Sequence, residues 1–83
     1  MHLPLADTTE IPTLVAAMIP HALRHGAIHG ALGTREPGQA MILVAPHNPT
    51  PLLREIEARD EEYTVEYLQE GPDDWHLKFT RVS

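Results

Sequence analysis

The amino-acid sequence predicts one α/β domain, an α+β two-layer sandwich whose elements follow the order strand, helix, strand, helix, strand, strand. The 83-residue chain is too short to build two independent hydrophobic cores. The apolar run QAMILVA (39–45) is typical of a buried strand, whereas YTVEYL (63–68) and WHLKFTRV (75–82) alternate apolar and polar residues. The first three strand candidates are separated by segments whose apolar residues recur with helical spacing. This order is typical of a layered α/β domain.

The first part of the chain is expected to form a strand followed by a helix. Residues 1–10 show no clean periodicity and are expected to be a loose tail, with a single domain at 11–83. The run IPTLVAAMI (11–19) fits a buried strand, although periodicity alone does not separate a strand from a helix start here. Pro20 suits the first position of a helix, which we expect to end before EPG (36–38).

Each helix has a predicted inner face. Gly26 and Gly30 are four residues apart in the first helix, so we expect the helix to pack closely against the sheet there. Before the second helix, PLLREIEAR (51–59), Asn48 or Thr50 is expected to cap the first turn. The inward-facing residues of the second helix are expected to be Leu52, Leu53 and Ile56.

The last two strands are expected to form a hairpin through the turn QEGPDD (69–74). The polar residues that alternate with the apolar ones indicate a sheet with one solvent-exposed face and helices on the other. The apolar residues of each strand share one face: Tyr63, Val65 and Tyr67 in the first strand, and Trp75, Leu77 and Phe79 in the second.

Composition excludes several classes of function. The chain contains no cysteine, which rules out disulfides, thiolate metal ligands and cysteine nucleophiles and fits a cytoplasmic protein. The formal net charge of −6 and the lack of a basic stripe argue against nucleic-acid binding. The sequence lacks the basic start of a secretory signal, and its apolar runs are far shorter than the ~20 residues of a membrane span. We therefore expect neither a nucleic-acid partner nor a membrane partner.

Two long segments carry a resemblance to a known family. RHGAIHGALGTREPGQAMILVAPHNPTPLLREIE (24–57) and VEYLQEGPDDWHLKFTR (65–81) resemble the domain of unknown function 2249 family, over residues 13–82. That family is similar in fold to the TusA/SirA sulfur carriers, which implies a four-stranded mixed sheet with two helices on one face. Members occur beside, or fused to, hemerythrin-like iron-binding domains and nitrogen-oxide metabolism proteins. The resemblance therefore implies a protein partner of this redox type.

The sequence departs from the sulfur carriers at the residue that carries their activity. Those proteins have a persulfide-bearing cysteine in a Cys-Pro-x-Pro motif at the start of the first helix. Counting back from Pro37-Gly38, that position is His21 here, and Ala22 and Arg24 replace the two prolines. Persulfide transfer requires a sulfur atom at this position. A sulfur-carrier role is therefore disfavoured.

Histidines recur at every fourth position of the first predicted helix. His21, His25 and His29 lie on one side of it, and neighbours in this set can bind one metal ion together. His21 and His29 are two turns apart, roughly 12 Å along the helix axis, so one ion does not easily bridge all three. A third ligand is better supplied by another part of the chain.

His47 is the candidate for that third ligand. If the first two strands are parallel, as in a right-handed βαβ unit, both strand-to-helix loops leave the same edge of the sheet. His21 opens the first helix and His47 precedes the second, so both would lie at this edge, with His25 one turn deeper. Imidazoles alone would suit zinc, copper(II) or nickel. The candidate metal ligands are thus His21, His25 and His47, with His29 as a further member.

Other interpretations of the same edge remain open. His25 lies between Ile28 and Leu32 on the helical wheel, so it is expected to point partly inward and to serve packing. His29 stands where the related family has an aromatic ring and is expected to pack in its place. The edge also contains polar residues that suit a ligand or a partner: Arg24, Asn48 and Thr50.

Catalysis is not expected, because no ordered acid is evident behind His47 to activate a nucleophile. The sequence favours a small non-catalytic accessory domain whose histidine-lined edge binds a metal ion or docks a redox partner. The alternative is a protein–protein interaction module in which the histidines are structural. A small enzyme acting on an anionic metabolite is the third hypothesis.

Overall fold

The computed structural model describes residues 11–83, so the tail expected at 1–10 lies outside the described residues. The order of elements is strand, helix, strand, helix, strand, strand, as the sequence predicts. The elements are β1 (Thr13–Val15), α2 (Arg24–Gly33), β2 (Ala40–Ala45), α3 (Thr50–Glu57), β3 (Tyr63–Glu70) and β4 (Trp75–Arg81).

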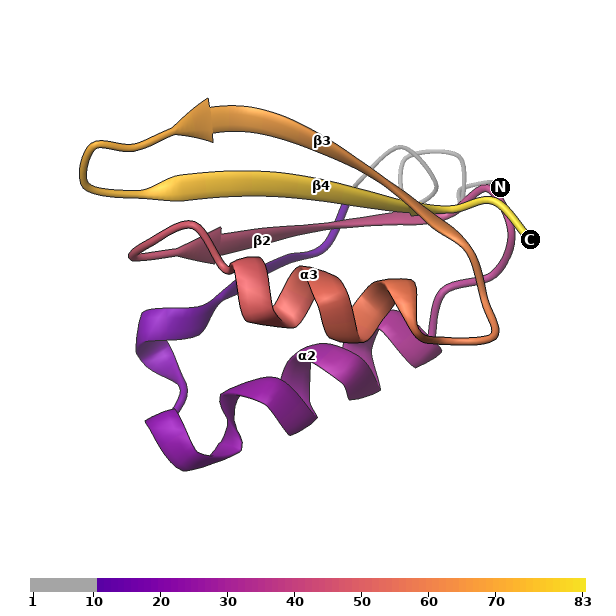
Figure 1. The fold of residues 1–83 in the computed structure, drawn as a ribbon, viewed down its shortest axis with the longest axis horizontal. Coiled ribbons are helices and arrows are strands. Elements are labelled where there is room, and N and C mark those ends of the chain that lie inside the picture. The colour runs from indigo at the N-terminus through magenta and orange to yellow at the C-terminus, as the bar shows by residue number, and fades with distance from the viewer. Residues whose placement is uncertain (1–10) are drawn as a thin grey trace, which may run out of the picture.

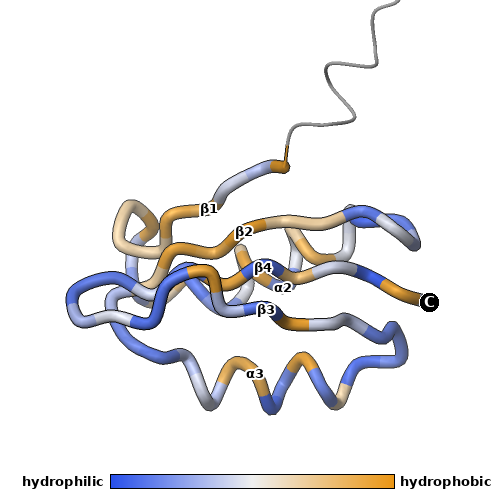
Figure 2. Tube along the Cα trace, turned by 90° about the horizontal axis from the view of Figure 1, so that it is seen from above, coloured by the Kyte–Doolittle hydropathy of each residue, from blue (hydrophilic) through white to orange (hydrophobic). Residues whose placement is uncertain are grey.

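The four strands form one mixed sheet in the order β1-β2-β4-β3. β1 and β2 are parallel, with Leu14 opposite Leu43. β2 and β4 are antiparallel, as are β3 and β4, and the predicted hairpin is confirmed by the pairing of Val65 with Phe79. Figure 2 shows the four strands side by side in this order, with β1 and β3 at the two edges.

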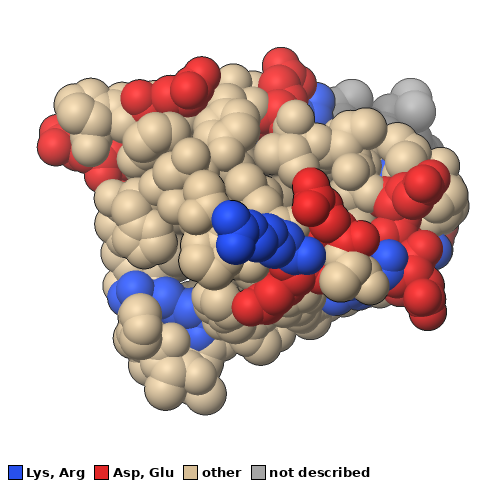
Figure 3. Space-filling model, viewed as in Figure 1, with Lys and Arg blue, Asp and Glu red and all other residues tan. Residues whose placement is uncertain are grey.

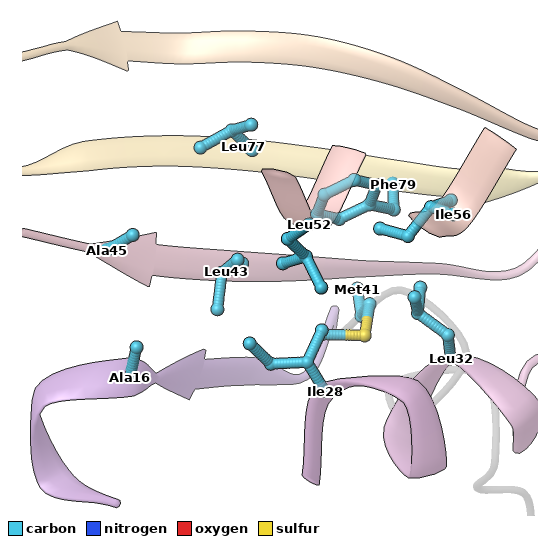
Figure 4. Packing of buried hydrophobic residues seen from close by; sticks show 10 residues of the cluster. All are labelled: Ala16, Ile28, Leu32, Met41, Leu43, Ala45, Leu52, Ile56, Leu77 and Phe79. Atoms are coloured by element: carbon cyan, nitrogen blue, oxygen red, sulfur yellow. The ribbon is translucent and has the colours of Figure 1, made fainter. Parts of the chain in front are cut away.

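Both helices cover the same face of the sheet, which confirms the predicted two layers (Figure 1). Because side chains alternate along a strand, β2 and β4 turn alternate residues toward the helices, and the buried ones are Met41, Leu43 and Ala45 in β2 and Leu77 and Phe79 in β4. Figure 4 shows these residues packing against apolar side chains of α2 and α3. The core consists of Ala16, Ile28, Leu32, Met41, Leu43, Ala45, Leu52, Ile56, Leu77 and Phe79.

Two glycines of α2 lie on a different face of the helix from the one that the sequence predicts. Gly26 and Gly30 do not pack closely against the sheet: both are exposed, and a Cβ added at either would meet no atom within 4 Å. The physical reason is that α2 buries only Ile28 and Leu32, which lie on the opposite side of the helix from the two glycines. The expected close approach of the helix backbone at these glycines is therefore wrong.

The helix starts also differ from expectation. The first turn after Pro20 is a 3-10 helix at His21–Leu23, and the α-helix begins at Arg24. No side chain within residues 11–83 caps α3, so the expected cap by Asn48 or Thr50 is wrong. Instead the Thr50 N–H donates to the carbonyl oxygen of Asn48 at 2.9 Å. The backbone turn thus satisfies a donor that a side chain would otherwise serve.

Among residues 11–83, no helix has the length and apolar character that crossing a membrane requires.

Candidate functional site: a cleft where both helices begin

Parallel pairing of β1 and β2 brings two loops to the same end of the sheet, as the sequence predicts. Each strand leads directly into the segment that starts a helix, so the starts of α2 and α3 lie together (left side of Figure 1). A cleft of about 110 Å³ opens between them. Its lining consists of Ala16, His21, Arg24, His25, Ile28, Leu43, Ala45, Pro46, His47, Pro49, Pro51 and Leu52.

The cleft has an apolar floor and a cationic rim. Buried residues of the sheet and of both helices form the floor, among them Ile28 of α2 and Leu43 of β2. Arg24 and three histidines, His21, His25 and His47, contribute the polar side chains. No aspartate or glutamate of the described part of the chain lines the cleft. In Figure 3, blue atoms at the corner where α2 begins are bordered by uncharged residues.

Arg24 is held in place by its neighbours. Its Nε–H donates to the carbonyl oxygen of Ile19 at 2.9 Å, and its Nη1 lies 3.3 Å from Nδ1 of His21. These contacts use two of the five guanidinium N–H donors. No carboxylate within residues 11–83 forms an ion pair with Arg24. Its positive charge therefore has no opposite charge from the described residues.

The loop that carries His47 is tied to the far strand of the sheet. The hydroxyl of Tyr67, on β3, donates to Oδ1 of Asn48 at 2.8 Å. Nδ1 of His47 lies 3.4 Å from the Asn48 carbonyl oxygen, a long contact that leaves the ring free to reorient. Asn48 and Thr50 themselves do not line the cleft. Asn48 shapes the loop, and His47 reaches the cleft.

His25 and His29 turn toward α3 and share one carboxylate. The Nδ1–H of His25 donates to Oε2 of Glu55 at 3.1 Å, and the Nε2–H of His29 donates to Oε1 at 2.9 Å. Nδ1 of His29 accepts from Nη1 of Arg59 at 2.9 Å, so both nitrogens of that ring are occupied. The side chain of His25, which is expected to point partly inward, is 57% exposed and directed to Glu55.

The two imidazoles change the chemistry of Glu55. The hydrogen bond from His29 is the largest cause that holds the pKa of this carboxyl below its ordinary value. Charge and a hydrogen bond from His25 act in the same direction, whereas partial loss of water opposes them. Glu55 is therefore an ionised acceptor that connects α2 with α3.

The structure gives mixed support to the predicted metal ligands. His21, His25 and His47 line one cleft, but His29 does not and is engaged by Glu55 and Arg59. Across the described residues 11–83, no group of three or more His, Asp or Glu side chains is arranged to hold one metal ion. Binding of zinc, copper or nickel by these histidines stays a prediction.

Sequence reasoning missed three residues that organise this region. Glu55 and Arg59 bind the histidines, and Tyr67 secures the His47 loop. The signal for Glu55 was present in part, because His25 and His29 are one turn apart and so present their rings to a common partner. Which acid on the second helix would face them depends on how the helices pack, and the sequence spacing does not reveal it.

The fold and the site together define a small α+β sandwich with a cationic, histidine-bordered cleft at one end of its sheet. The family model described as "Uncharacterized conserved protein (DUF2249)" matches residues 15–81, and the chain belongs to this family. The family predicted from the sequence is thereby confirmed. No curated protein and no solved structure matches the chain.

Proposed function

We propose that the domain is a non-catalytic binding module whose cleft receives an acidic side chain of a protein partner. The observation that carries the proposal is the composition of the cleft. Arg24 and three histidines border it, and no acid among the described residues does, although the whole chain has a net charge of −6. A partner's carboxylate thus finds opposite charge here and meets repulsion over much of the remaining surface.

The size of the cleft favours a side chain over a whole cofactor. Its volume of about 110 Å³ is well below the roughly 300–1,000 Å³ of pockets that enclose drug-sized ligands. The apolar floor suits the methylene groups of a glutamate, and Arg24 at the rim suits its carboxylate. One anchoring side chain in a small pocket is a common way for protein interfaces to concentrate binding energy.

The first partners to test are hemerythrin-like and nitrogen-oxide redox proteins, since the family resemblance implies proteins of this type. A partner of this kind would place an exposed glutamate in the cleft. The proposal assigns no redox chemistry to the domain itself, whose part is recognition.

The test uses NMR titration of the ¹⁵N-labelled chain with two capped tripeptides, Ala-Glu-Ala and Ala-Gln-Ala. We expect Ala-Glu-Ala alone to shift the signals of Arg24 and His47. Arg24→Gln should weaken this binding by at least about tenfold, because a charged hydrogen bond is lost. Arg54→Gln is the matched control, since Arg54 is an exposed base of α3 outside the cleft. Equal shifts with both peptides, or unchanged binding by Arg24→Gln, would refute the proposal.

Metal binding at the same cleft is the second candidate, because His21, His25 and His47 all line it. Calorimetric titration with zinc and copper(II) addresses this function separately. Binding tighter than tens of micromolar that is lost in both His21→Ala and His47→Ala would support the metal site. Binding that survives both substitutions would exclude it.

A further inference from the structure

A second concave surface lies at the opposite side of α3 from the cleft, between α3 and the edge strand β3. It is an open groove of about 720 Å³ and shares no lining residue with the cleft. Its apolar lining residues are Leu53, Ile56, Tyr63, Val65, Tyr67 and Val82. Two of these, Val65 and Val82, are 39% and 51% exposed, so the groove presents apolar surface to solvent.

The outer backbone of β3 has hydrogen-bonding groups without a partner in the sheet. Within the described residues 11–83, β3 is an edge strand that pairs only with β4. The Val82 N–H donates to the Glu62 carbonyl at 2.8 Å, which makes Glu62 and Val82 a hydrogen-bonded pair of the ladder. Because such pairs alternate in antiparallel strands, the N–H and C=O groups of Tyr63, Val65 and Tyr67 point away from β4.

The three residues with outward-pointing backbone groups also line the groove with their side chains. Tyr63, Val65 and Tyr67 turn their side chains toward the helix face and line the groove, while their backbone groups point outward. In Figure 1, β3 lies at the edge of the sheet, on the outer side of β4. A strand added beside β3 would thus place alternate side chains over the groove. The register shift between Tyr67 and Gln69 limits regular pairing to the first half of β3.

The charge of the groove selects the kind of strand that fits. Four acids and one base line it: Glu57, Asp60, Glu61 and Glu62, with Arg59. Arg59 is already engaged by Glu61 at 3.2 Å and by the ring of Tyr63, at 5.7 Å from the ring centroid. Figure 3 shows acidic side chains gathered where α3 connects to β3, on the right. A second copy of this chain would bring its own acids against these, so like charges disfavour self-pairing.

We propose that β3 and the groove beside it bind an extended, basic segment of another protein by strand addition. The backbone groups of Tyr63, Val65 and Tyr67 supply the hydrogen bonds, and alternate apolar side chains of the segment enter the groove. Lysine or arginine residues at the end of the segment, next to the loop between α3 and β3, pair with Asp60, Glu57 and Glu62. The other edge strand, β1, has only three residues and offers a much shorter ladder.

The test measures binding of the capped peptide Lys-Lys-Val-Thr-Val-Thr-Lys-Lys to the ¹⁵N-labelled chain. Its alternate valines can face the groove, and its terminal lysines can reach the acids between α3 and β3. We expect shifts at the amides of Tyr63, Val65 and Tyr67 and none at the cleft residues His47 and Arg24. Val65→Pro removes an outward N–H while leaving the β4 ladder intact, a position where an edge strand tolerates proline. Loss of this strand-to-peptide hydrogen bond should weaken binding by roughly two- to tenfold.

Two further experiments test strand addition if circular dichroism shows that the Val65→Pro variant does not fold. A peptide N-methylated at every second residue should lose binding to the unaltered protein. The double variant Asp60→Asn, Glu62→Gln should bind less tightly, and binding should weaken as salt rises. Equal binding of the same peptide with glutamate in place of each lysine, or self-association of the chain through β3 in sedimentation experiments, would overturn the proposal.

Discussion

Nε2 of His29, on α2, lies 2.9 Å from Oε1 of Glu55, on α3, and this contact joins the two helices at their exposed side. His25 donates to the other oxygen of the same carboxylate. The helices pack on the sheet through their apolar faces, whereas Glu55 connects them to each other. Because His25 also lines the cleft, the same carboxylate helps to orient one wall of the proposed binding site.

The lowered pKa of Glu55 predicts how the stability of the domain depends on pH. A carboxyl whose pKa is lower in the folded state than in the unfolded state stabilises the fold at pH values above its ordinary pKa of 4.5. This contribution is lost as the pH falls through the folded pKa. Glu55→Gln should therefore lower the free energy of unfolding at pH 5 to 6, and the difference from the unaltered protein should close below pH 4.5. Urea unfolding at several pH values measures this difference.

The matched control for this prediction is Glu57→Gln. Glu57 is an exposed acid of α3, and the carboxylate that pairs with His25 and His29 in the described chain is that of Glu55. It should show no comparable pH-dependent difference. A difference that is constant from pH 3 to pH 8 would contradict this account.

Replacing the exposed glycines of α2 should stabilise the domain. Gly26 and Gly30 lie within the helix, and a Cβ at either position would meet no atom within 4 Å. Each of Gly26→Ala and Gly30→Ala should raise the free energy of unfolding by about 0.8–1 kcal/mol through helix propensity. For a domain of this size, thermal unfolding should shift upward by roughly 4–8 °C per kcal/mol.

Gly71→Ala is the opposing control. Gly71 has φ of 65°, and an added Cβ would lie 3.3 Å from the ring of Trp75. This substitution should lower the stability, because an alanine is strained at positive φ and crowds the ring. If Gly26→Ala and Gly30→Ala also destabilise the protein, these positions contact something that the fold alone does not explain.

Tyr67→Phe should loosen the His47 loop. It removes the hydrogen bond from the hydroxyl to Asn48 Oδ1, at a cost of about 0.5–1.5 kcal/mol in stability. The backbone amides of Asn48 and His47 should exchange with solvent faster, as hydrogen-exchange NMR measures. Tyr63→Phe removes a similar hydroxyl bond, to the Leu32 carbonyl, and should leave that loop unchanged. Equal exchange in both variants would show that Asn48 is held by other contacts.

The central strand should dominate the stability of the core. Phe79 is fully buried between the sheet and the helices, and Phe79→Ala should cost about 3–5 kcal/mol. Leu68, by contrast, is 47% exposed, and Leu68→Ala should change the stability by less than about 0.5 kcal/mol. Chemical unfolding of the two variants in parallel measures the contrast. A large loss for Leu68→Ala would mean that β3 is covered by a further contact.

The layered fold and the shared edge of the two helix starts follow from the sequence, because they depend on hydrophobic period and on the handedness of the strand–helix–strand connection. The placement of His21 and His47 at one cleft also follows from the sequence. The orientation of the His25 side chain does not. Helical-wheel position places it near Ile28, but a polar ring at the border of a face turns to whichever hydrogen-bonding group the neighbouring helix presents, and here that group is Glu55.

The glycine expectation failed for a related physical reason. Small residues at four-residue spacing indicate a smooth strip on a helix, but they do not show whether that strip faces the sheet or the solvent. For α2 the larger apolar residues Ile28 and Leu32 occupy the buried face, so Gly26 and Gly30 are left outside. The groove along β3 likewise depends on strand order, which local patterns leave undetermined.

The central position of β4 has a consequence for synthesis of the chain on the ribosome. β2 and β3 both pair with β4 and not with each other, and β4 follows all the other strands in chain order. Until Trp75–Arg81 has emerged, the nascent chain has a βαβ half and a lone β-strand with no partner to dock on. Folding must therefore be a late event that occurs after the whole domain has been translated, and premature termination within β4 should yield a chain that proteases recognise as unfolded.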